Sequence, residues 1–138
     1  MPQISTPAAQ VQVATVALTT AQVLTLGTTP VTVVAAQGAG TVVVPVTAYG
    51  SLTFNTTAYA NAGVLNLSWN GANGITIANL SSNLIAAASQ VAVAGGLSLA
   101  TAAVASFANL PLTVHSTGAV TLGNSPWRLT VAYAVLAT

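Results

Sequence analysis

The chain of 138 residues contains no aspartate, glutamate, lysine or cysteine, and Arg128 is its only formally charged side chain. This composition excludes enzymes that need a carboxylate or a cysteine, metal sites with several acidic or cysteine ligands, and basic nucleic-acid-binding patches, so we expect no enzyme, no cofactor, no small-molecule substrate and no nucleic-acid partner. Because ordinary soluble domains draw about a quarter of their residues from the charged set, a surface with one charge favours association with copies of the chain or with another protein.

The first nine residues are expected to form an extended arm, followed by one domain over residues 10–138. The arm contains Pro2 and Pro7 among small polar residues. It has neither the basic region nor the apolar region of a secretory signal. The arm is either a disordered terminus or a segment that becomes ordered on a neighbouring subunit. We favour the second interpretation, with Pro2 and Ile4 as contact residues.

From Gln10 onward, runs of Val, Thr, Leu and Ile are separated by Gly, Asn and Pro, which predicts short β-strands joined by turns. In the last run, between Leu129 and Val135, the apolar residues recur with a period of two, which places them on one face of a sheet. Strands at this spacing indicate an all-β, single-domain β-sandwich or jelly roll. The predicted strands are Val11–Leu18, Val31–Ala35, Val42–Phe54, Val64–Trp69, Ile75–Leu80, Leu97–Phe107, Leu110–Val114 and Trp127–Leu136.

Several predicted turns carry residues that tolerate a positive φ angle. Asn70-Gly71 and Asn73-Gly74 are typical of tight hairpins, and a Gly-rich turn spans Gln37–Gly40. Pro45 interrupts an apolar run and cannot donate a hydrogen bond to a neighbouring strand. We therefore expect that strand to lie at a sheet edge or to be bulged at Pro45.

The segment Asn83–Ala94 (NLIAAASQVAVA) is ambiguous, because its alanines favour a helix. Apolar residues at spacings of three and four predict a short helix or an irregular loop over one end of the sheets, and a strand is the competing interpretation. The uncharged stretch Leu84–Ala105 is long enough to span a membrane, but it is mostly alanine and lacks flanking basic residues and an aromatic belt. We therefore expect no membrane partner.

Several segments of the chain follow a recognisable pattern. The stretch Pro30–Pro45 (PVTVVAAQGAGTVVVP) comes after the lead-in Leu18–Leu26 (LTTAQVLTL), and Leu129–Val135 (LTVAYAV) lies near the end of the sequence. Together with Thr56–Tyr59 and Asn109–Leu112, these segments resemble small virion proteins of tailed bacteriophages. Two departures, Thr41 where the pattern often has lysine and Gly123–Pro126 where it has a Gly-Asp-Gly turn, both remove charge.

The resemblance implies a capsid decoration or cement protein, with a β-sandwich fold and no active site. Such a structural protein is expected on the outer capsid surface of the virion, bound to the major capsid protein at junctions between its subunits. The resemblance also implies a homo-oligomer, either a homodimer or a homotrimer, that stabilises the shell. The alternative is a tail or head-fibre domain that binds a host-surface glycan, with Trp69 and Asn70 as the candidate sugar-binding residues.

Arg128 and three aromatic residues are the candidate interface residues. Arg128, beside Trp127, is either a solubilising surface residue or an anchor that meets a carboxylate on the partner, since Arg and Trp are enriched at interfaces. Trp69 and Tyr59 are either core aromatics or contact residues. His115 is expected to be a surface or interface residue, as a lone histidine usually is. It could contribute to a metal site only where a symmetric oligomer brings several copies of it together.

Overall fold

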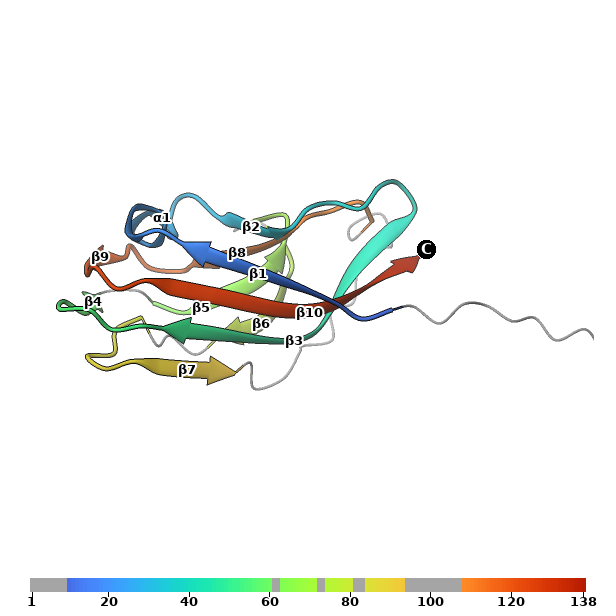
Figure 1. Ribbon diagram of the computed structural model, residues 1–138. Helices are drawn as coiled ribbons and strands as arrows, with labels where there is room; N and C mark the ends of the chain where they lie inside the picture. The colour runs from blue at the N-terminus through green and yellow to red at the C-terminus, as the bar shows by residue number, and fades with distance from the viewer. Residues whose placement is uncertain (1–9, 61–62, 72–73, 81–83, 94–107) are drawn as a thin grey trace, which may run out of the picture.

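The computed structural model describes residues 10–60, 63–71, 74–80, 84–93 and 108–138 (Figure 1). About half of these residues belong to two four-stranded antiparallel sheets. Sheet A has the order β1 (Gln12–Leu18), β10 (Trp127–Ala137), β3 (Thr41–Leu52) and β7 (Gln90–Val93). Sheet B has the order β2 (Val31–Val34), β8 (Leu112–Ser116), β5 (Leu65–Trp69) and β6 (Thr76–Leu80). A short pair, β4 (Tyr59–Ala60) and β9 (Thr121–Leu122), lies at one end of the molecule.

The core lies between the two sheets, because alternate residues of each strand point inward. Leu129 and Val131 on β10 are fully buried, as are Leu67 on β5 and Val114 on β8, and all four belong to one hydrophobic cluster. Figure 1 shows sheet A lying in front of sheet B. The described part of the chain is thus an all-β fold of antiparallel sheets, and the period-two prediction for β10 is confirmed.

Seven of the predicted strands are confirmed to within two residues at each end. The eighth, Leu97–Phe107, lies outside the described residues, as do the arm over residues 1–9 and Asn73. The predicted turn at Asn70-Gly71 has positive φ angles of 60° and 78°. These angles explain why an Asn-Gly pair stands at this position, since few other residues adopt them without strain.

The strand β3 is bulged beside Pro45, as the sequence predicts. Its register on β10 slips by one residue, which leaves Val46 as an extra residue between Pro45 and Thr47. On its other side, β3 pairs with β7 only from Tyr49 to Leu52 within the described ranges. The bulge and the single-sided pairing together accommodate a residue that has no N–H to donate.

The helix α1 (Thr20–Thr25) lies between β1 and β2 and was not among the predicted elements. Its first turn is closed by a capping box, in which the Gln22 N–H donates to Thr19 Oγ1 at 3.2 Å and the Thr19 N–H donates to Gln22 Oε1 at 2.9 Å. The helix places Val23 and Leu26 in the core with no exposed surface. Among the residues that the structure describes, no helix is both long and apolar enough to cross a membrane.

The short helix expected near 83–94 is wrong for the part of that segment that the structure describes. Residues 84–89 form turns and bends, and Gln90–Val93 is the strand β7, which pairs with Tyr49–Leu52 of β3. Helix propensity differs by less than about 1 kcal/mol per residue between ordinary residues, so tertiary context overrides it. Here the backbone of β3 supplies the hydrogen-bond partners that a helix would otherwise provide within the segment.

Candidate functional site

The outer face of sheet A is the side of that sheet turned away from the core. The pairing registers place one row of its side chains across all four strands, with Arg128 between Ala17 on β1 and Ser51 on β3. All but one of its side chains are uncharged, and most are small. We define this face by Val13, Thr15, Ala17, Thr47, Tyr49, Ser51, Val91, Val93, Arg128, Thr130 and Ala132.

Large apolar side chains on this face are exposed to solvent. Val13 is 67% exposed, Val91 64%, Val93 61% and Tyr49 41%. In natural proteins, charged residues on exposed sheets usually prevent association with other sheets. The only charged residue on this face is Arg128. Tyr49 pairs with Val93, and Val91 lies on the same strand, so these three side chains form an apolar group on β3 and β7, while Val13 lies on the opposite edge strand β1. An exposed apolar group of this kind is a candidate contact with another protein.

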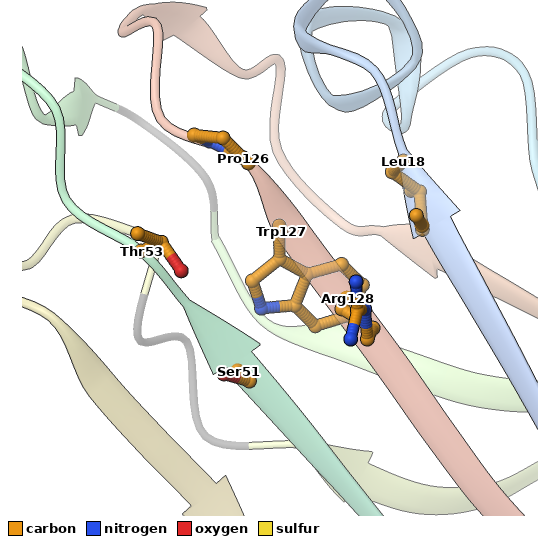
Figure 2. Close-up of a pocket in the computed structure, with 7 residues that line it drawn as sticks. Leu18, Ser51, Thr53, Pro126, Trp127 and Arg128 are labelled. Atoms are coloured by element: carbon orange, nitrogen blue, oxygen red, sulfur yellow. The ribbon is translucent and has the colours of Figure 1, made fainter.

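Arg128 is exposed and lies beside a hollow of about 170 Å³ at the start of β10. Figure 2 shows it next to Trp127, with Leu18 on β1 to one side and Ser51 on β3 to the other. The hollow is lined by Ala17, Leu18, Ser51, Thr53, Pro126, Trp127 and Arg128. Because the chain has no acidic side chain, no carboxylate of its own side chains is available to pair with this guanidinium.

The three aromatic candidates are core residues in the fold. Trp127 is 1% exposed, Tyr59 2% and Trp69 8%. The Trp69 indole N–H donates to the Val43 carbonyl at 2.8 Å, and the Tyr59 hydroxyl donates to the Ser125 carbonyl at 2.8 Å. This burial favours the core interpretation of the three side chains. For Trp69 and Trp127, the alternation of apolar residues along the strand indicates an inward-facing side chain.

The other residues predicted to contact a partner fall into two groups. Pro2 and Ile4 lie outside the described residues. Arg128 is exposed on the outer face of sheet A and is the one predicted contact residue that the structure describes at the surface. The apolar residues around it were not singled out from the sequence, because their grouping depends on strand pairings between distant segments.

His115 lies in a buried polar cluster on β5 and β8, on the side of sheet B that is turned away from the core. It is 5% exposed, and its Nδ1 lies 3.2 Å from Ser68 Oγ. The Ser68 hydroxyl donates its only hydrogen to the Gly71 carbonyl at 2.9 Å, so Nδ1 must be the donor to Ser68. Thr113 completes the cluster by donating to the Ser68 carbonyl and accepting from the Gly71 N–H.

This cluster has the residue types of a nucleophile and a base but not their arrangement. A general base must accept the proton of the nucleophile, whereas the His115 Nδ1 donates toward Ser68. Burial also lowers the pKa of His115, which keeps the imidazole neutral. No three residues of the metal-binding types come together in the described part of the chain. The cluster therefore closes the loop at Gly71 onto sheet B rather than forming a reactive centre.

The comparisons with known proteins yield one weak likeness. No known protein family matches the chain, and no curated protein is significantly similar to it. The chain is similar to a chain of the solved structure "Cyanophage Pam1 capsid asymmetric unit", with a TM-score of 0.43 and 17% identity, over 96% of this chain and 93% of that chain.

Proposed function

We propose that the chain is a non-enzymatic structural protein of a tailed-bacteriophage virion, bound to the outside of the capsid as a decoration or cement subunit. In this role it binds the major capsid protein at junctions between subunits and stabilises the shell. A homodimer or homotrimer is the form we propose for the bound protein. The resemblance of the sequence to small virion proteins of this class motivates the proposal.

The observation that carries the proposal is the outer face of sheet A. Its valines and Tyr49 are exposed among small neutral residues, and Arg128 is the one charged residue on the face. Burial of apolar area contributes about 25 cal/mol per Å², and this contribution needs no ion pairs. Such a surface is better suited to a protein that stays bound to a larger assembly than to one that diffuses freely.

The connections between strands support the jelly-roll form of the sandwich. The strands β1 and β10, which come first and last along the chain, are hydrogen-bonded neighbours in sheet A. Among the described strands of the two large sheets, every step along the chain except β5 to β6 crosses from one sheet to the other. Jelly rolls of viral capsid proteins are double-sheet folds of eight strands, with connections that cross between the sheets.

The alternative function, a fibre domain that stacks a host glycan on Trp69, finds little support in the site. Stacking on a sugar requires an open indole face, whereas Trp69 is 8% exposed and its N–H is bonded to Val43. In the Asn70-Gly71 turn beside it, the Asn70 N–H donates to the carbonyl of Pro111, just before β8, and the Gly71 N–H donates to Thr113 on β8. These contacts fit a structural turn.

The proposal is tested with empty shells of the parent phage that lack this chain. Purified protein is added to the shells, and bound copies are counted after the shells are separated from free protein. We expect saturable binding at many copies per shell and a higher temperature of shell disruption. Absence of binding, or copies found only on tails or fibres, would contradict a cement role.

A further inference from the structure

We infer that the outer face of sheet A docks on a protein other than this chain, which presents a carboxylate side chain to Arg128 within an otherwise uncharged contact. The inference rests on the proposed function, which supplies the capsid shell as the partner. Beyond the proposed function, the inference specifies which face is buried, which residue makes the charged contact and which group the partner must present.

The position of Arg128 within the face is the first step. Its neighbours in register are Ala17 and Ser51, two of the smallest side chains on the face. Arg128 is thus flanked by two small side chains, and it lines the hollow of about 170 Å³. A side chain from a partner can approach Arg128 there without displacing any residue of sheet A.

The second step is the cost of covering this face. Burial of an ionised group without a partner is strongly unfavourable, whereas an Arg–carboxylate pair satisfies the guanidinium with two parallel hydrogen bonds. A partner that covers the whole outer face of sheet A also covers Arg128 and must therefore supply an acceptor for it. The fork of the guanidinium matches a carboxylate better than a single carbonyl oxygen.

The third step argues against a second copy of the chain as the occupant, because the only carboxylate that a copy carries is that of a chain terminus. None of the 138 residues is an aspartate or a glutamate, so a copy has no acidic side chain to offer. Packing this face against another copy would bury guanidinium groups without side-chain counter-charges. The contacts that make a homo-oligomer are therefore expected on another surface, and this face remains for the capsid.

The rest of the face requires few polar groups from the partner. Thr15 Oγ1 and Thr130 Oγ1 lie 3.1 Å apart and hydrogen-bond to each other across β1 and β10. The remaining exposed positions include Val13, Val91 and Val93, which need only apolar neighbours. The partner surface is thus expected to be apolar and neutral around one acidic residue.

The affinity test compares three variants with the wild-type chain on the empty shells described above. Arg128→Glu reverses the charge, Arg128→Gln removes it, and Thr32→Glu adds a charge at an exposed position of β2 in sheet B. We expect Arg128→Glu to lower the affinity by about 30-fold or more, as for loss of one partner of a buried charge pair. Arg128→Gln should fall between wild type and Arg128→Glu, and Thr32→Glu should bind like wild type.

A cross-linking test identifies the group that faces Arg128. The Arg128→Lys variant carries the only lysine of the chain, and a carbodiimide joins its amine to a carboxylate in direct contact, forming an amide while the reagent takes up the water lost. We expect one product between this chain and the major capsid protein, mapped to an Asp or Glu by mass spectrometry. Reversal of that acidic residue to Lys should restore binding of Arg128→Glu.

The outcomes separate the two proposals. If the wild-type chain does not bind shells, the proposed function fails and the inference fails with it. If wild type binds and Arg128→Glu binds equally well, the inference is overturned while the proposed function stands. A change in oligomeric state of Arg128→Glu by light scattering would assign the face to self-association and also overturn it. Unchanged circular dichroism and melting temperature confirm that the variants are folded.

Discussion

Gly50 on β3 lies against the indole ring of Trp127 on β10, so closely that a Cβ at Gly50 would stand 2.6 Å from Cζ2 of that ring. Gly50 pairs with Leu129 in the register and faces the core, where Trp127 is 1% exposed. A buried tryptophan thus occupies the space left by the missing side chain of a glycine within a strand. Glycine in a strand commonly marks such a close approach.

We therefore expect Gly50→Ala to lower the free energy of unfolding by about 1–3 kcal/mol, the usual cost of an added methyl group in a packed core. Urea denaturation monitored by Trp fluorescence measures the change. Ser51→Ala, one residue along and on the opposite face of β3, is the matched control and should stay within about 0.5 kcal/mol of wild type. Equal stabilities of the two variants would contradict the close packing of Gly50 on Trp127.

A second prediction concerns the capping box of α1. Thr19→Ala removes the acceptor for the Gln22 N–H and should lower the free energy of unfolding by about 1 kcal/mol. Thr19→Ser keeps a hydroxyl and should retain most of the stability. Thermal or urea denaturation distinguishes them, and an equal loss in both variants would show that the methyl group of Thr19, rather than its hydroxyl, stabilises the helix.

The same helix shows what the sequence did and did not reveal. The Thr19-x-x-Gln22 motif is a local signal for the start of a helix. Because the residues around it have a β-strand pattern, the sequence analysis predicts no helix there. The strand β7 has no such local signal, because its conformation depends on pairing with Tyr49–Leu52 in a distant part of the chain. Local alternation predicts most strands, while the partner of each strand is decided by packing across the whole domain.

The candidate site divides along the same line. The exposure of Arg128 follows from its place between the inward-facing residues Trp127 and Leu129, and the sequence alone supports it. The grouping of Val13, Val91 and Val93 on one face required the order β1-β10-β3-β7, which no local pattern contains. Composition indicates an associating surface, and the sheet order shows that Val13, Tyr49, Val91 and Val93 share one face of sheet A.

A third prediction concerns pH. Burial lowers the pKa of His115 from its ordinary value of 6.5, so above that pH the imidazole is neutral in both the folded and the unfolded chain and stability is complete. Below it the unfolded chain binds a proton that the folded chain does not. The free energy of unfolding should therefore fall as pH decreases, by at most about 1.4 kcal/mol per pH unit, and level off below the folded-state pKa.

The composition makes this pH test unusually clean. No aspartate or glutamate titrates in the acid range, so one histidine is the only side chain that contributes there. Urea denaturation between about pH 4 and pH 8 follows the change. His115→Asn keeps a donor for Ser68 and cannot titrate, and its stability should be level across that range. A wild-type curve as level as that of His115→Asn would contradict the lowered pKa.

The last prediction concerns the ionic strength at which the chain binds capsid shells. A contact built from apolar burial and neutral hydrogen bonds is little affected by salt, because salt screens only interactions between charges. With Arg128 as the one charged group, we expect the affinity to change by less than about tenfold between low salt and molar salt. A fall of several orders of magnitude would indicate several ion pairs, which a surface with one charge cannot form. Arg128→Gln provides the control, since its weaker binding should show no salt dependence beyond that of the neutral contact.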